Sequence, residues 1–146
     1  NDKSFRVAFI GSTPDILDSV NNKIKNELPN IITTVLISPP FGKVWDNNSY
    51  IKTLNQTKTD VVFVALGCPK QEKWMYENYL KTDAVLFGIG GALSAYEGSV
   101  KRAPKWMQKN GLEWFHRLIT EPKRMLKRYF YTNTKFIYIL TRYKFS

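Results

Sequence analysis

Hydrophobic residues along this chain fall into short unbroken runs that alternate with longer amphipathic stretches. Each run contains apolar and largely β-branched residues and is bounded by Gly, Pro, Asn or Asp, which is typical of a buried strand. Strands are therefore predicted at four places along the chain, namely residues 6–10, 31–37, 60–66 and 84–91.

The stretches between these runs have the spacing of helices. In 14–28 the apolar residues recur at helical intervals, Thr13 is positioned to cap the helix, and Pro14 suits its first turn. A second helix is predicted to start at Pro69, with Glu72 in its first turn, and a weaker one over 47–56. Strands that alternate with helices predict an α/β fold with a parallel, Rossmann-like sheet of about four or more strands, covered by helices.

The strand pattern stops near Ala103, and the remainder of the chain is predicted to be helical. Short helices are expected over 103–111 and 112–120, and Pro122 is expected to open a long basic helix. One apolar stripe is predicted along that helix, formed by Leu126, Tyr129, Phe130, Ile137 and Leu140. The chain is therefore divided into an α/β body, 1–100, and a basic helical appendage, 101–146.

Charge separates the same two regions. Residues 1–97 contain ten Lys and Arg and ten Asp and Glu, whereas residues 98–146 contain twelve and two, so the net charge of +10 comes from the last third. A basic helix face is often simply solvated, but here Trp, Tyr and Phe are interleaved with the cations and have apolar surface to bury. An anionic ligand or surface is expected. Nucleic acid is the alternative partner, but the segment contains no known nucleic-acid-binding motif.

Two features of the sequence limit the cellular compartment and the kind of membrane contact that are expected. A single cysteine, Cys68, excludes an internal disulfide framework and fits a reducing compartment. No apolar run approaches the ~20 residues that span a bilayer, so any membrane contact is expected to be peripheral.

Three predicted strands end in glycine-bearing turns, at 11–14, 67–72 and 88–98. In a parallel sheet these ends lie at one edge, where helix N-termini offer N–H groups to anions. A phosphate-bearing ligand, in particular a nucleotide, is therefore expected there, although a glycine after a strand often serves only the turn. The candidate binding residues are Gly11, Thr13, Gly67, Lys70, Gln71, Gly90 and Gly91.

The sequence gives less support to a dinucleotide-binding, cysteine-based, histidine-based or metal site. The glycines at 88–91 lack the spacing of a dinucleotide fingerprint. Cys68 has no neighbouring His partner in the sequence, and the lone His116 is more readily explained by packing or hydrogen bonding. No cluster has metal-ligand spacing, so neither a metal nor a cofactor is expected.

Three stretches carry a resemblance to a known family. They are "VAFIGSTPDILDSVNNKIKNELP", "DVVFVALGCPKQEKW" and "FGIGGALSAYEGSVKRAPKWMQKNGLEWFHRLITEPKRMLKRY". Together they resemble the WecG/TagA/CpsF family of bacterial glycosyltransferases over nearly the whole chain to about Tyr129.

The resemblance implies an inverting, metal-independent transfer of a sugar, commonly of N-acetylmannosamine type, from a UDP donor to a polyprenyl-diphosphate-linked acceptor. It implies work at the cytoplasmic face of the bacterial plasma membrane, with the basic appendage closing over the active site there. The family's arginines fall on Arg117 and Arg124, with Lys127 or Arg128 in the next turn, as groups that stabilise charge. Ser94 and Arg102 join the substrate-binding residues.

This chain departs from the family pattern in two ways. Ser94 stands where an acidic residue is usual. The family also has an N-terminal portion before the "VAFIG"-like strand, which is expected to hold the catalytic base, and this chain starts too late to include it. An inactive sugar-nucleotide-binding or membrane-binding remnant is therefore the alternative reading. Homo-oligomer formation is left open.

Overall fold

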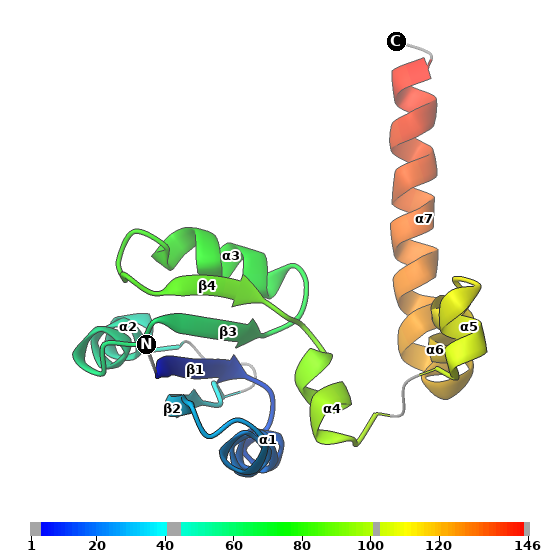
Figure 1. Cartoon of the computed structure of the whole chain (residues 1–146). Coiled ribbons are helices and arrows are strands. Elements are labelled where there is room, and N and C mark those ends of the chain that lie inside the picture. Colours follow the sequence, from blue (N-terminus) through cyan, green and yellow to red (C-terminus); the bar gives the residue numbers. More distant parts are fainter. Residues whose placement is uncertain (1–3, 41–44, 101–102, 145–146) are drawn as a thin grey trace. The chain divides into compact units, whose positions relative to one another are not determined.

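The computed structural model describes residues 4–40, 45–100 and 103–144, and the side chains at 124, 127–129 and 144 lie outside that description. The chain divides into two compact units, Asn1–Lys101 and Arg102–Ser146. The first unit is an α/β body and the second is helical (Figure 1).

The body is built on a parallel sheet, as the alternation of apolar runs predicted. Its strands are β1 (Phe5–Gly11), β2 (Ile31–Ile37), β3 (Val61–Ala65) and β4 (Val85–Gly88). They lie side by side in the order β2-β1-β3-β4, and every pairing is parallel (Figure 1). All the strands therefore end at the same edge, which confirms the predicted α/β class.

Helices flank both faces of this sheet. On one face α1 (Pro14–Glu27) packs on β1, and α4 (Ala92–Glu97) packs against α1, around a core that contains Phe9 and Leu17. On the other face α2 (Asn47–Gln56) and α3 (Lys70–Asn78) bury Leu54 and Trp74 against the strands. The strands alternate between these two cores because successive side chains point to opposite faces.

Three local expectations are corrected. Thr13 is the N-cap residue of α1, but its side chain makes no capping hydrogen bond. Pro69 precedes α3 as its N-cap and is not its first helical residue. The fourth strand ends at Gly88 instead of Gly91, because Gly90 has a positive φ of 52° and Gly91 is already the N-cap residue of the short helix α4. The helix α4 itself was not predicted, since its six residues are too few to show helical periodicity.

The second unit consists of α5 (Lys105–Lys109), α6 (Glu113–Thr120) and α7 (Pro122–Lys144). Its described buried apolar side chains are few, and they include Met107 of α5 and Met125 of α7. Along α7 the predicted stripe residues Leu126, Phe130, Ile137 and Leu140 are all exposed. Among the described residues, no helix combines the length and the apolar character needed to cross a bilayer.

Candidate functional site

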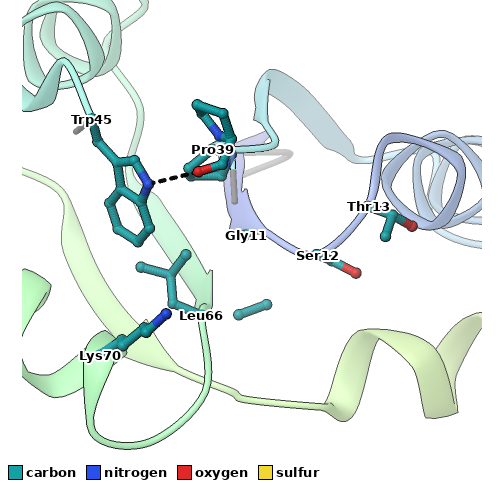
Figure 2. A pocket seen from close by; sticks show the side chains of 9 residues that line it. Gly11, Ser12, Thr13, Pro39, Trp45, Leu66 and Lys70 are labelled. Carbon is teal, nitrogen blue, oxygen red and sulfur yellow. Dashed lines mark hydrogen bonds between the residues drawn. The ribbon is translucent and has the colours of Figure 1, made fainter. Parts of the chain in front are cut away.

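A pocket of about 230 Å³ lies where β1 and β3 end (Figure 2). Its wall comes from the residues that follow three strands, which is the edge where ligands bind in parallel sheets. The described lining residues are Gly11, Ser12, Thr13, Pro39, Pro40, Trp45, Ala65, Leu66 and Lys70.

The floor of the pocket depends on Gly11 at the end of β1. Its φ of +106° is in the left-handed region, and a Cβ there would lie 2.6 Å from both the carbonyl carbon and the oxygen of Ala65. Only glycine fits that approach. The next residue, Ser12, also has a positive φ, 71°, and its carbonyl accepts a 2.8 Å hydrogen bond from the Ser38 hydroxyl. The turn is thus held open toward the pocket by a backbone that side chains rarely adopt.

Two helix N-termini meet the pocket. Thr13 is exposed there and is the N-cap residue of α1, and its carbonyl accepts the Leu17 N–H at 3.1 Å. Lys70 is the first residue of α3 and the only charged side chain among the described lining residues. The unpaired N–H groups of a first helical turn favour anions, and an ammonium group beside them adds to that preference.

An aromatic wall faces the lysine across the pocket. Trp45 lies just before α2, and its indole Nε1–H donates a 3.2 Å hydrogen bond to the carbonyl of Pro40. In Figure 2 the indole ring, the Leu66 side chain and the amine end of Lys70 border one opening. The pocket therefore combines a flat apolar surface with a cation, which suits a heterocyclic ligand that carries an anionic group.

Gln71 lies outside this lining and joins two of the glycine turns. Its side chain is only 8% exposed, and its Oε1 accepts a 2.9 Å hydrogen bond from the Gly90 N–H. Its Nε2 donates to the carboxylate of Glu72 at 2.9 Å. A Cβ on Gly88 would lie 2.9 Å from that Nε2. The amide therefore fixes the turn after β4 against the start of α3.

The structure brings together some of the predicted site residues and separates others. Gly11, Thr13 and Lys70 line the pocket, and Gly67, with φ +76°, follows the lining residue Leu66. Gly90 is hydrogen-bonded to Gln71 at the same edge, while Gly91 is the N-cap residue of α4 and Ser94 lies within its first turn. Gly67, Gln71, Gly90, Gly91 and Ser94 are not among the described lining residues of the pocket.

The predicted arginines belong to the second unit. Arg117 lies on α6 with an exposed side chain, and its carbonyl accepts a hydrogen bond from the Thr120 hydroxyl. Arg124 and Arg128 fall within α7, but their side chains lie outside the described residues, as does Arg102 altogether.

The part of the pocket that follows β2 was not predicted from the sequence. The predicted site residues came from glycine-bearing strand ends, whereas this part is formed by Pro39, Pro40 and the aromatic ring of Trp45. A signal was available, because the run 31–37 is a parallel strand whose end must reach the same edge.

Away from the pocket, a polar cluster joins α4 to α1. The Tyr96 hydroxyl donates to Glu27 at 3.0 Å, and the Lys23 amine donates to the Tyr96 carbonyl at 2.7 Å. Burial raises the pKa of the Tyr96 phenol above its ordinary value, and the Glu27 carboxylate raises it further. The hydrogen bond from the Ser99 side chain is the main cause that lowers the pKa of Glu97. In the described part of the chain, no three His, Cys, Asp or Glu side chains come together as a metal site.

Comparison with known proteins gives a consistent result. The sequence model of the glycosyl transferase WecG/TagA/CpsF family matches residues 1–146. An N-acetylglucosaminyldiphosphoundecaprenol N-acetyl-beta-D-mannosaminyltransferase of Bacillus subtilis (strain 168) is 41% identical over 130 residues, which cover 86% of this chain and 50% of the relative.

A protein of the same name from Bacillus spizizenii is 33% identical over 123 residues, covering 84% of this chain and 47% of that relative. The chain thus spans about half the length of the curated relatives that it matches.

Proposed function

Because the chain belongs to the glycosyl transferase WecG/TagA/CpsF family, we propose that it forms part of a transferase that moves a sugar from a UDP donor to a polyprenyl-diphosphate-linked acceptor. The observation that carries this proposal is the 41% identity to the Bacillus subtilis relative over 86% of the chain. The names of both relatives support N-acetylmannosamine as the sugar and a lipid-linked N-acetylglucosamine as the acceptor. The pathway would be teichoic acid or surface polysaccharide synthesis.

The pocket at the ends of β1 and β3 is the proposed UDP site. The Trp45 ring offers the uracil an apolar surface, while Lys70 and the N-terminus of α1 offer an anionic diphosphate favourable electrostatic interactions. A UDP-sized ligand would extend beyond a pocket of about 230 Å³, so its sugar end is proposed to lie toward Gly90 and Ser94.

Charge on the leaving diphosphate is proposed to be met by side-chain cations in place of a metal. A transferase must stabilise the negative charge that develops as the sugar leaves, and preorganised guanidinium groups do so through paired hydrogen bonds. Arg117, Arg124 and Arg128 are proposed for this role. The general base is proposed to come from the half of the relatives' length that this chain does not span, since Ser94 has no carboxylate.

Peripheral attachment at the cytoplasmic face of the membrane is proposed for the second unit. Residues 98–146 contain twelve basic and two acidic residues, and α7 exposes Phe136, Ile137 and Leu140. Cations attract anionic headgroups, while aromatic and aliphatic side chains suit the interface. A lipid-linked acceptor would be met at that surface.

A transfer assay tests the proposal. Full-length protein is given UDP-N-acetylmannosamine and a polyprenyl-diphosphate-linked N-acetylglucosamine, and UDP release is followed together with the glycolipid product. Product formation that persists in EDTA is expected. Absence of product with this donor and with a panel of other UDP-sugars would favour the inactive remnant, and activity that needs added Mg²⁺ or Mn²⁺ would overturn the metal-free mechanism.

A further inference from the structure

On the sheet face that α1 covers, the side chains of β1 are buried and those of β4 are exposed to solvent. Residues of neighbouring strands form a row across it, Phe9 to Phe63 to Phe87, with stacked ring centroids 5.3 Å and 6.0 Å apart. Along this row the exposed fraction rises from 4% at Phe9 to 51% at Phe87. A bulky aromatic side chain on β4 thus meets solvent although it continues the core of β1.

The parallel row beside it shows the same gradient. Val7, Val61 and Val85 are register partners, and the exposed fraction rises from 4% at Val7 to 55% at Val85. The β4 surface, as we name the exposed side chains of Val85 and Phe87, is therefore an apolar patch on an edge strand. Such edges are usually covered or made polar, because they attract other chains.

Topology explains why no helix of this unit covers the β4 surface. The step from β1 to β2 runs in one direction across the sheet and carries α1 to one face. The steps from β2 to β3 and from β3 to β4 run in the opposite direction, so right-handed crossovers carry α2 and α3 to the other face. The helix α4 packs against α1. Among the described crossovers, none leaves a helix over β3 and β4 on the α1 face.

We propose that the β4 surface is the docking site for a helix from the half of the family's polypeptide that this chain does not span. The curated relatives are about twice as long as the matched region, so their chains have the residues to supply such a helix. A parallel sheet of this class is stable with helices on both faces, and an apolar helix beside α1 would complete the layer.

This location also places the docked half beside the candidate site. Phe87 is followed by Gly88, at which β4 ends, and by Gly90, which is fixed through Gln71 to the start of α3. A helix on the β4 surface would bring its neighbouring residues to the edge where β1 and β3 form the pocket. The docking itself is independent of the reaction, so failure of the transfer assay would leave it intact.

Site-specific photo-crosslinking in the full-length protein tests the docking. A Phe87→p-benzoylphenylalanine variant is irradiated and its cross-linked peptides are identified by mass spectrometry. The matched control is Tyr76→p-benzoylphenylalanine, since Tyr76 is an aromatic residue of α3 that is 76% exposed on the other side of the sheet. An intramolecular link from position 87 to a residue outside 1–146 is expected, with a yield at least 5-fold above the control.

Other outcomes overturn the proposal. They are a link from position 87 to α7, a link to a second copy of the chain, a yield equal to the control, and a reading frame that adds no residues to 1–146.

A near-isosteric variant keeps the proposal testable if the bulky probe prevents folding. Val85→Cys and the control Tyr76→Cys are made in a Cys68→Ser background, because Cys68 is itself exposed. In the full-length protein we expect a thiol reagent to modify position 85 at least 10-fold more slowly than position 76. Equal rates would show that the β4 surface is open to solvent and would overturn the docking.

Discussion

The two units of this chain differ in how far their apolar side chains are buried. Asn1–Lys101 buries its apolar side chains in two cores, one on each face of the sheet. In Arg102–Ser146 the helix α7 runs for 23 residues with most of its described aromatic and aliphatic side chains exposed. Apart from the β4 surface, the first unit therefore covers its apolar core by its own packing. The apolar side chains exposed on α7 have no such cover within the described part of the second unit.

Charge sharpens this contrast. Basic and acidic residues balance over 1–97, but basic residues exceed acidic ones twelve to two over 98–146. A balanced surface suits a self-contained domain, while a cationic surface with exposed aromatics suits an anionic partner. We propose a division of function on this basis, in which the body forms the pocket and the appendage supplies positive charge and contact with the membrane surface.

Matched leucine truncations give the largest expected difference. Leu17→Ala, in the core under α1, should lower the free energy of unfolding by about 2–5 kcal/mol, because it leaves a cavity. Leu140→Ala, on the exposed part of α7, should change it by less than about 0.5 kcal/mol. Urea titration monitored by circular dichroism measures both. A comparable loss at Leu140 would show that α7 is packed, and would remove the contrast.

Turnover should be the property most sensitive to the appendage. Arg117→Ala is expected to lower kcat about 100-fold or more if its guanidinium meets charge that develops on the diphosphate. The control Arg142→Ala removes an exposed arginine of α7 and should leave kcat nearly unchanged. Steady-state assays of full-length protein check both, alongside melting curves. Equal effects of the two changes would mean that the appendage contributes only general positive charge.

Two glycines with positive φ, one in each unit, test how tightly the backbone is packed. Gly111→Ala should cost about 1 kcal/mol, since φ is +68° but nothing lies within 4 Å of the added Cβ. Gly11→Ala should cost about 2–3 kcal/mol, because the Cβ also strikes the Ala65 backbone at the pocket floor. Thermal unfolding compares them. If Gly11→Ala is no costlier than Gly111→Ala, the turn after β1 is looser than its geometry indicates.

The smallest expected effect concerns Tyr96. Its neutral phenol is favoured in the folded state, since its pKa is raised above the value of about 10 expected when unfolded. Its contribution is therefore complete below about pH 10 and is lost as the pH rises through the folded-state pKa. Tyr96→Phe should remove that part of the pH dependence, at a cost of at most about 1 kcal/mol below pH 10.

The control for this effect lies in the second unit. Tyr143→Phe removes the hydroxyl of an exposed tyrosine of α7 and should change the free energy of unfolding near neutral pH by less than about 0.5 kcal/mol. A wild-type-like curve for Tyr96→Phe would show that the bond to Glu27 does not hold α4 in solution.

Much of the fold could be predicted from the sequence because each buried strand is an unbroken apolar run. The runs at 31–37 and 60–66 could be identified without tertiary information, and the parallel direction of the strands in the sheet followed from the helices between them. The end of the fourth strand could not, because the turn at Gly90, with its positive φ, is hydrogen-bonded to Gln71, nineteen residues earlier in the chain, and such a contact leaves no local sequence pattern.

The site was predictable in position but only partly in membership. Gly11 and Lys70 followed from strand ends and helix starts, which are local features. The place of Trp45 depends on its packing against the core under α2 and α3, and the inward orientation of Gln71 depends on its bond to Gly90, nineteen residues later. Gln71→Ala is thus expected to weaken ligand binding because it removes the hydrogen bond that holds the Gly90 turn, as well as any direct contact with the ligand.

The central claim is that UDP binds the pocket of the first unit, and the indole N–H signals of the four tryptophans test it most directly. In a ¹H–¹⁵N NMR titration with UDP, the Trp45 signal should shift and saturate, because its ring lines the pocket. The signals of Trp106, exposed in the second unit, and of the buried Trp74 should stay in place, whereas Trp114 is not used because it lies one turn from Arg117 on α6. A Trp45 signal that does not move while that of Trp106 does would contradict the account, since it would place the nucleotide on the appendage.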